Sequence, residues 1–480
     1  MMRVAILHFH LRPGGVTRVI EMACEALRRD GCEPLVIVGE PPPPDCRIPQ
    51  ESLAVVPDLA YAVSSHRAGD LQAAVQGVLS RHWQGGADIL HLHNHSLGKN
   101  FALPRAVSRW AAEGRSLLLQ IHDFAENGRP SNYRGLLAEL EGTAGLSRCL
   151  YPVAPRIGYA TLNSADRGRL QQAGLTSFCE LLPNPVSLTA GGSPVRKEEL
   201  GAERLLVYPT RAIRRKNIGE ALLWSALAPP GEKVVLTAAP QTGPDRERHD
   251  EWKSFAEALG LPVVFDAQGL LGRPTRDFLL GADVCLTTSV AEGFGMAFLE
   301  PWLAGCPLVG RDLPSVTQDF RRAGLILDSL YERLDIPLEW IGLEAVRELV
   351  ESKVRATCAA YGVDFRVEFV RLAETALIQP SGVDFGRLDE TLQRRVIEGV
   401  ARGSLPAGEI SPPQPARTPS LVAPNRKVVE DRFDLGDYGK RLREIYGRLC
   451  SAEVATPEYL EAGRVLHAGL DFEDFYALRS

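Results

Sequence analysis

Two acidic residues flank a glycine-rich turn that reads Glu292-Gly293-Phe294-Gly295-Met296, with Glu300 following in an apolar segment. If this segment is one helix ending at Gly305, Glu300 lies about two turns into it. Glycines let a ligand approach the backbone, and free N–H groups at a helix start attract anions. The stretch therefore predicts an anion site between two acids, suited to a diphosphate with hydroxyl-rich groups at both ends. An ordinary strand-turn-helix unit with two solvated glutamates is the alternative.

Polar side chains also follow other apolar runs of the sequence. His10 with the Gly14-Gly15 loop follows the first run, and the segments His93-Asn94-His95 and His122-Asp123 follow two later ones. The carboxyl ends of strands line the ligand crevice in open α/β sheets. We therefore expect these three strand ends to point at one place. In the second half of the chain, basic residues follow an apolar run in the same way: Arg211, Arg214, Arg215 and Lys216.

Alternating apolar strands and amphipathic helices position these residues. Residues 3–10, 16–30 and 35–39 predict a strand, a helix and a second strand, which is a βαβ unit on a parallel sheet. The same alternation resumes after residue 204, so we expect an α/β protein with two parallel-sheet domains. Proline- and glycine-rich segments suggest the boundaries. We expect a first domain over 1–185, a linker over 186–203, a second domain with a helical addition over 204–400, a proline-rich loop over 404–427, and a helix with a tail over 428–480.

Composition excludes several classes of protein. The 480 residues are 45% hydrophobic and 24% charged, which is typical of globular chains, and the net charge of -6 argues against nucleic-acid binding. The nine cysteines are scattered and form no C-x-x-C pair, so we expect free thiols in a reducing compartment. No apolar run reaches membrane-spanning length, and Met1–Leu7 reads as a strand and not as a signal peptide. These features predict a cytoplasmic protein without an integral membrane segment, either a monomer or a homodimer.

In this order, the motifs resemble those of the retaining family 4 glycosyltransferases of the GT-B fold, also called group 1 glycosyltransferases. The resemblance covers roughly residues 1–315 and 433–449, whereas residues 320–430 depart from it. It implies two Rossmann-like domains facing across a cleft, the first binding the acceptor and the second the nucleotide sugar, with a helical C-terminal extension. The matching segments are Glu292-Gly293-Phe294-Gly295 through Glu300, Gly305-Cys306-Pro307-Leu308-Val309, Arg211 with Lys216, Pro13-Gly14-Gly15, His91-Leu92-His93, His122-Asp123 and Pro183-Asn184-Pro185-Val186.

The resemblance assigns a role to each motif. Arg211 and Lys216 would neutralise the leaving diphosphate, Glu300 would accept hydrogen bonds from the ribose, and Glu292 would bind hydroxyls of the transferred sugar. We therefore expect a catalytic set of His122, Arg211, Lys216 and Glu292. The expected donor-binding set is Gly14, Gly15, Arg211, Lys216, Glu292, Gly293, Phe294, Gly295, Met296 and Glu300. Arg214 and Arg215 are expected on a solvated face.

The resemblance also implies the reaction. A hexose, glucose or mannose, would pass from a UDP, GDP or ADP sugar with retained configuration. The leaving phosphate would take the acceptor's proton, so no protein nucleophile is needed and the two glutamates are not an acid/base pair. The acceptor would be a small molecule, and basic residues near strand ends would suit a phosphorylated or carboxylated one. Its expected binding set is Arg12, Lys99, His122, Asp123 and Arg129.

We expect no cofactor and no required metal. The chain has no D-x-D triplet, and the alternating His91, His93 and His95 have no acidic or cysteine partner nearby in the sequence. Two alternatives stay open: a sugar phosphorylase of the same fold, and a non-catalytic subunit that binds a nucleotide sugar. A dinucleotide-dependent oxidoreductase is disfavoured, because the first loop lacks G-x-G-x-x-G.

Overall fold

The computed structural model describes residues 1–188, 191–240, 243–410 and 419–479. They divide into two compact units. Unit 1 comprises Met1–Pro185 and Phe433–Leu470, and unit 2 comprises Val186–Arg432 and the segment that begins at Asp471. The chain therefore passes from one unit to the other three times.

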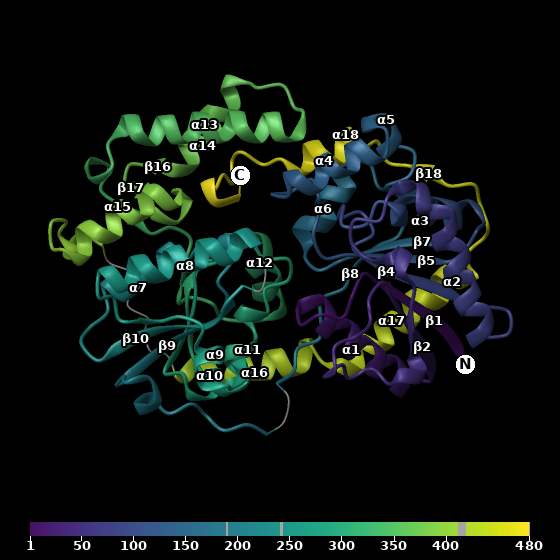
Figure 1. The fold of residues 1–480 in the computed structure, drawn as a ribbon, viewed down its shortest axis with the longest axis horizontal. Coiled ribbons are helices and arrows are strands. Elements are labelled where there is room, and N and C mark those ends of the chain that lie inside the picture. Colours follow the sequence, from purple (N-terminus) through teal and green to yellow (C-terminus); the bar gives the residue numbers. More distant parts are fainter. Residues whose placement is uncertain (189–190, 241–242, 411–418, 480) are drawn as a thin grey trace. The chain divides into compact units, whose positions relative to one another are not determined.

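Unit 1 is built on a parallel sheet of order β3-β2-β1-β4-β5-β7-β8 (Figure 1). Its central strands β4 and β5 are buried along their whole length, and this includes the polar residues His91, His93 and Gln120. The strands are β1 Met2–His8, β2 Cys32–Val38, β3 Leu53–Val55, β4 Ile89–His93, β5 Leu117–Ile121, β7 Ile157–Thr161 and β8 Cys179–Leu181; β6 Pro152–Val153 pairs with β18 Glu458–Tyr459. The helices are α1 Gly15–Arg29, α2 Ala68–His82, α3 Ala102–Ala112, α4 Pro130–Glu139, α5 Gly142–Leu146, α6 Ser164–Gln172, α17 Leu435–Ser451 and α18 Ala462–Gly469.

Helix α17 belongs to the core of unit 1 although it lies far along the chain. The Asp434 carboxylate accepts hydrogen bonds from the N–H groups of Gly436 at 2.7 Å and Asp437 at 3.0 Å, which fixes the helix start. A Cβ on Gly439 would lie 3.0 Å from that of Ala26, so glycine is what lets α17 approach α1. One face of the helix is apolar and buried, and it consists of Tyr438, Leu442, Ile445, Tyr446 and Leu449.

Unit 2 is built on a second parallel sheet, of order β11-β10-β9-β12-β13-β14, which confirms the predicted α/β class. Its strands are β9 Arg204–Arg211, β10 Glu232–Ala238, β11 Val263–Val264, β12 Val284–Thr287, β13 Leu308–Arg311 and β14 Leu330–Tyr331. Its helices are α7 Ile218–Ala226, α8 Gly243–Ala258, α9 Ala267–Leu271, α10 Thr275–Gly281, α11 Glu300–Ala304, α12 Pro314–Ala323, α13 Leu343–Tyr361, α14 Val367–Leu377, α15 Glu390–Ala401 and α16 Pro419–Arg432.

A small antiparallel sheet, β15 Asp335–Ile336 with β17 Gly382–Asp384 and β16 Ile378–Gln379, is added to unit 2 with α13 and α14. Fully buried charges attach it to the parallel sheet. Arg311, at the end of β13, donates hydrogen bonds to Asp384 at 2.8 Å and to Glu220 of α7 at 2.7 Å. Removing one partner of such a buried pair costs about 3–5 kcal/mol, so this network ties the addition firmly to the core.

Two expected segment boundaries are wrong. Most of the expected linker is part of unit 2, because Val195 and Leu200 are buried in a cluster with Leu205. The expected proline-rich loop ends earlier than predicted, because α16 starts at Pro419 and its Arg426 donates a hydrogen bond to the Trp302 carbonyl at 3.2 Å. Residues 411–418 of that loop lie outside the described residues. Among the helices that the structure describes, none has the length and apolar character needed to cross a bilayer.

Candidate functional site

The candidate donor subsite of unit 2 centres on a buried ion pair between Lys216 and Glu292. Lys216 ends a 3-10 turn that follows β9, and Glu292 lies in the loop after β12. The Lys216 ammonium donates a hydrogen bond to Glu292 Oε1, and Ser289 Oγ donates to the same oxygen at 2.6 Å. Only 14% of the lysine side chain and 8% of the glutamate side chain are exposed. The two residues that the sequence placed in separate motifs therefore meet.

Further hydrogen bonds hold the two loops together below this pair. The Tyr208 hydroxyl lies 2.6 Å from Ser289 Oγ and donates to the Lys216 carbonyl at 3.1 Å. Thr288 Oγ1 donates to the same carbonyl at 3.0 Å, and the Val290 N–H donates to the Arg215 carbonyl at 2.9 Å. Sequence reasoning missed Tyr208, Thr288 and Ser289 as supporting residues; the polar run at the end of an apolar strand was the available signal.

Charge favours an ionised carboxylate at this position. Burial alone would raise the pKa of Glu292, but the positive charges of Lys216 and Arg215 and the hydrogen bonds from Lys216 and Ser289 lower that pKa below its usual value. Burial, opposed by Glu292, lowers the pKa of Lys216, and the neighbouring positive charges of Arg215 and Arg211 lower it further. Four charged groups thus act on one another here, three of them positive. An added anion would meet a net positive field.

The glycine turn differs from the predicted single helix. Residues Met296–Phe298 form a 3-10 turn, and a separate helix, α11, begins at Glu300. Gly295 has the left-handed φ of 86°, and Pro301 lacks the N–H group that a helix interior requires, so a new helix must begin just before it. Glu300 is buried in the first turn of α11, and Gly293 precedes the 3-10 turn in the loop. The expected position of Glu300 two turns into one helix is therefore wrong.

Phe294 serves the core with its side chain. It is 5% exposed and packs edge-on against Phe320 of α12 at 5.5 Å between ring centroids. Its ring is therefore part of the core of unit 2. Arg211 is exposed at the end of β9. Arg214, expected on a solvated face, instead donates a hydrogen bond to the Ala477 carbonyl at 3.2 Å, so that expectation is wrong.

The candidate acceptor subsite of unit 1 contains a line of buried histidines. His122 follows β5 and lies 2.8 Å, Nε2 to Nδ1, from His93 at the end of β4. The Asn94 side chain accepts hydrogen bonds from the N–H groups of His122 at 2.7 Å and Asp123 at 3.2 Å, and Asn94 itself has a left-handed φ of 58°. Burial lowers the pKa of His122 to about 4, so its imidazole is neutral at pH 7. Sequence reasoning missed Asn94 as the residue that shapes this strand end.

Basic residues surround one tyrosine in the same unit. Lys99 lies 5.6 Å from the ring centroid of Tyr61, and the Tyr61 hydroxyl lies 2.9 Å from His10 Nε2. Burial raises the pKa of Tyr61, while the charges of Arg12 and Arg129 lower it. Burial, followed by the charge of Arg129, lowers the pKa of Lys99. The expected cations Arg12, Lys99 and Arg129 therefore gather around a residue that the sequence did not single out.

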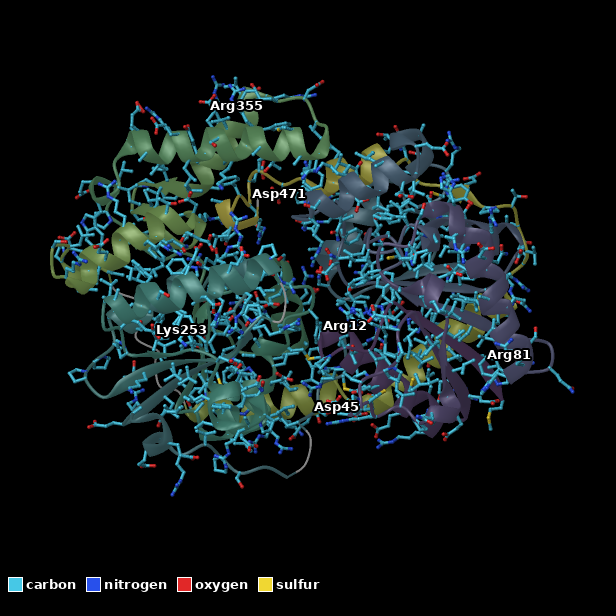
Figure 2. All side chains as sticks on the ribbon, viewed as in Figure 1. Arg12, Asp45, Arg81, Lys253, Arg355 and Asp471 are labelled. Carbon is cyan, nitrogen blue, oxygen red and sulfur yellow. The ribbon has the colours of Figure 1, made fainter. Side chains whose placement is uncertain are left out.

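Two of these cations have carboxylate partners. Arg12, labelled in Figure 2, pairs with Glu40 at 2.6 Å, and Arg129 pairs with Asp123 at 2.6 Å.

Gly14 and Gly15 lie at the start of α1 beside Arg12, and a Cβ on Gly15 would meet no described atom within 4 Å. Packing within the unit therefore gives no reason for a glycine at this position.

Of the alternating histidines, His91 uses both ring nitrogens in hydrogen bonds within the protein, and His93 and His95 use one each. His91 bonds to Tyr446 at 2.8 Å and to Gln120 at 2.9 Å, and His95 bonds to the Leu150 carbonyl at 2.9 Å. Among the described residues, no group of three or more histidine, cysteine or acidic side chains is arranged to hold a metal ion.

Comparisons with known proteins show what the chain resembles in sequence and in fold. Residues 14–168 match a family model described as a glycosyl transferase 4-like domain. The mannosylglucosyl-3-phosphoglycerate synthase of Petrotoga mobilis is 28% identical over 386 residues, covering 74% of this chain and 73% of the relative. The structure of sucrose-phosphate synthase from Thermosynechococcus elongatus is 14% identical with a TM-score of 0.54, covering 94% of this chain and 99% of that one. The structure of HepE of Anabaena, solved with UDP and glucose, is 15% identical with a TM-score of 0.52, covering 93% of this chain and 100% of that one.

The fold and these similarities define the chain as a glycosyltransferase with the GT-B fold. The resemblance of the motifs to family 4, the group 1 glycosyltransferases, agrees with the family-model match and with the relative from Petrotoga mobilis. The family-model match lies in unit 1. Arg211, Lys216, Glu292 and Glu300 belong to unit 2, outside the matched residues.

Proposed function

We propose that this glycosyltransferase moves a hexose, glucose or mannose, from a nucleoside diphosphate sugar to a small acceptor that carries a phosphate or carboxylate group, with retention of configuration. The buried Lys216–Glu292 pair beside Arg211 and Arg215 is the observation that supports binding of the nucleoside diphosphate sugar. A leaving diphosphate gains negative charge as the glycosidic bond breaks. Prearranged cations in a buried site stabilise that charge without reorganising during the reaction.

The pairing of Glu292 supports its role as a hydroxyl reader. Its lowered pKa disfavours proton donation at neutral pH, and Lys216 and Ser289 both occupy its Oε1. Glu292 therefore holds sugar hydroxyls as an ionised acceptor, and Glu300 accepts from the ribose. In the retaining reaction the leaving phosphate takes the proton of the acceptor hydroxyl while the sugar bonds to that oxygen on the same face. No protein nucleophile takes part.

His122 and the strand-end cations serve the acceptor. A neutral His122, fixed by His93 and Asn94, offers a hydrogen bond to a hydroxyl and adds no charge beside the transferred sugar. Lys99, Arg12 and Arg129 suit an anionic acceptor group. The relative from Petrotoga mobilis is named for a product that contains phosphoglycerate, which supports a phosphoglycerate-bearing acceptor here. We also propose that no metal is required, because Lys216, Arg211 and Arg215 supply the positive charge that a metal would otherwise provide.

The decisive experiment pairs glucose and mannose donors with each nucleotide. Wild-type protein is incubated with UDP, GDP and ADP sugars and with 3-phosphoglycerate, glucosyl-3-phosphoglycerate or neutral sugars, in the presence of EDTA. We expect transfer to a phosphoglycerate-bearing acceptor, with the donor's anomeric configuration retained in the NMR spectrum of the product. Cleavage of a disaccharide by inorganic phosphate without any nucleotide would instead establish a sugar phosphorylase.

The half-buried Lys99 should determine affinity for the charged acceptor. We expect Lys99→Gln to raise the KM for a phosphorylated acceptor about tenfold or more, because a hydrogen bond to a charged group contributes about 1.5–3 kcal/mol. Donor affinity should not change, since Lys99 lies in unit 1. Steady-state kinetics with each substrate varied in turn measures both. Lys440→Gln, at an exposed lysine of the same unit, is the matched control. An unchanged acceptor KM in Lys99→Gln removes Lys99 from the site.

A further inference from the structure

The C-terminal segment from Asp471 to Arg479, here called the tail, is fastened to unit 2. It follows α18 in the sequence, belongs to unit 2 from Asp471 onward, and ends in a 3-10 turn over Ala477–Arg479. Phe472 stacks on Phe369 with ring centroids 4.5 Å apart. The resemblance to known glycosyltransferases did not extend to this segment, and the sequence suggested only an aromatic tail.

Charged groups anchor the tail to the core of unit 2. Arg387 donates hydrogen bonds to the Phe475 carbonyl at 2.6 Å and to the Asp474 carboxylate at 3.2 Å. Arg387 also pairs with Asp384 at 3.3 Å, and Asp384 belongs to the fully buried Arg311 network. The Tyr476 ring lies between two guanidinium groups, 4.2 Å from that of Arg387 and 4.4 Å from that of Arg479. The tail thus rests on a rigid base.

From this base the tail reaches the loop that carries Glu292. The Arg479 guanidinium donates to the Val290 carbonyl through Nε at 2.6 Å and also through Nη2. Val290 is completely buried and packs with Tyr476 and Leu478. Its own N–H group donates to the Arg215 carbonyl at 2.9 Å. Both backbone polar groups of Val290 are therefore fixed, one of them by the tail.

The tail also reaches the turn that carries Lys216. The Ala477 carbonyl accepts a hydrogen bond from Arg214 Nη2 at 3.2 Å. Arg214 opens the 3-10 turn that ends at Lys216, just as Val290 lies in the loop that leads to Glu292. One short segment thus contacts both loops whose side chains form the ion pair. Groups that stabilise charge in a reaction must be held to within about 0.5 Å, and fixing their backbones is one way to achieve this.

We propose that the tail is a positioning element of the donor subsite, in which Arg479 clamps the Val290 carbonyl and so fixes Glu292 opposite Lys216. Arg479 acts through Val290 and has no contact with substrate in this role. The inference rests on the proposed function for its effect on donor binding. Its structural part, the restraint of the Val290 loop, is independent of any substrate.

The test uses Arg479→Ala, which removes the guanidinium, and Arg479→Lys, which retains one donor group. The control is Arg464→Ala, at an exposed arginine of α18. Hydrogen–deuterium exchange of the ligand-free proteins is followed in peptides covering residues 285–296 and 211–217. Titration calorimetry measures the affinities for UDP, GDP and ADP. Steady-state kinetics with the donor sugar measures kcat and KM for sugar transfer. We expect Arg479→Ala to exchange at least tenfold faster at Val290 and to bind the preferred nucleoside diphosphate about tenfold more weakly, with an unchanged acceptor KM. Arg479→Lys should recover part of both effects, and Arg464→Ala should match the wild type.

Unchanged exchange at Val290 in Arg479→Ala overturns the clamp, whatever the ligand results. Faster exchange with unchanged nucleoside diphosphate affinity overturns the positioning role. If Arg479→Ala does not fold, Arg479→Lys decides both questions, because its single donor group cannot reproduce the two hydrogen bonds. Wild-type protein that binds none of the three nucleoside diphosphates contradicts the proposed function instead, and the exchange data then still decide the clamp.

Discussion

Lys216→Met should lower the rate of sugar transfer at least a hundredfold. The substitution removes the ammonium group but keeps an unbranched side chain of similar length, so packing changes little. Losing one prearranged group that stabilises developing negative charge costs about 10²–10³ in kcat. The same change leaves Glu292 ionised and buried without its main partner, which should lower the free energy of unfolding by about 3–5 kcal/mol. Initial rates and urea unfolding measure the two effects separately.

A double variant separates catalysis from stability. Lys216→Met combined with Glu292→Gln removes both charges, so we expect most of the lost stability to return while transfer remains at the level of the single variant. Lys197→Met is the matched control, since Lys197 pairs with Asp283 at 2.6 Å in unit 2 but is 38% exposed. The Lys197→Met variant should retain sugar transfer, and its free energy of unfolding should fall by less than about 1 kcal/mol. Near-normal transfer in Lys216→Met would refute the donor subsite.

Mild acid should unfold unit 1. Burial lowers the pKa of His8 and His91 to about 3 and that of His95 and His122 to about 4, and it lowers the pKa of His93 as well. Because these values lie below the 6.5 of an unfolded histidine, the unfolded chain takes up protons first as the pH falls. Their contribution to stability is complete above pH 6.5 and is lost as the pH falls toward 4. At pH 5 each of the four histidines with a stated pKa lowers the free energy of unfolding by about 2 kcal/mol, or by about 8 kcal/mol together. This sum approaches the whole stability of a typical domain.

One buried carboxyl opposes this trend. Burial raises the pKa of Glu126 to about 7, so Glu126 favours the folded state as the pH falls from 7 to 4.5 and offsets about one histidine. Urea unfolding between pH 7.5 and 5 measures the slope. His95→Gln should reduce that slope by about 1.4 kcal/mol per pH unit below pH 6.5, where the unfolded histidine takes up its proton. Equal slopes in His95→Gln and wild type would contradict the prediction.

The sequence predicted the two parallel sheets because their strands are apolar runs that end in polar residues. The strand expected over residues 3–10 is β1, and the apolar runs before His93, before His122 and up to Arg211 are β4, β5 and β9. The small antiparallel sheet escaped prediction because its strands have two or three residues and no periodicity can emerge over such a length. Its attachment by Arg311 to Asp384 and Glu220 depends on pairs distant in the chain. The break of the expected helix before Pro301 was readable, since proline requires a first-turn position.

In the candidate site, residue types and motif order predicted Lys216 and Glu292, and their contact follows from the fold. The supporting residues could not be predicted in the same way. Tyr208 meets Ser289, His93 meets His122 and Arg479 meets Val290 only because the chain brings distant segments together. Nothing local distinguishes such a tyrosine or arginine from one on the surface. Tertiary contact decides which polar residues near a site restrain it.

The three passages of the chain between the units bear on how the enzyme can be dissected. A fragment ending at Pro185 would lack α17, whose Leu442 and Tyr446 fill the core of unit 1 and whose Tyr446 bonds to His91. A fragment from Val186 to Arg432 would lack the tail that restrains Val290. Neither unit is encoded by one continuous segment of the gene. Separate production of unit 1 or unit 2 therefore requires a circularly permuted or spliced coding sequence.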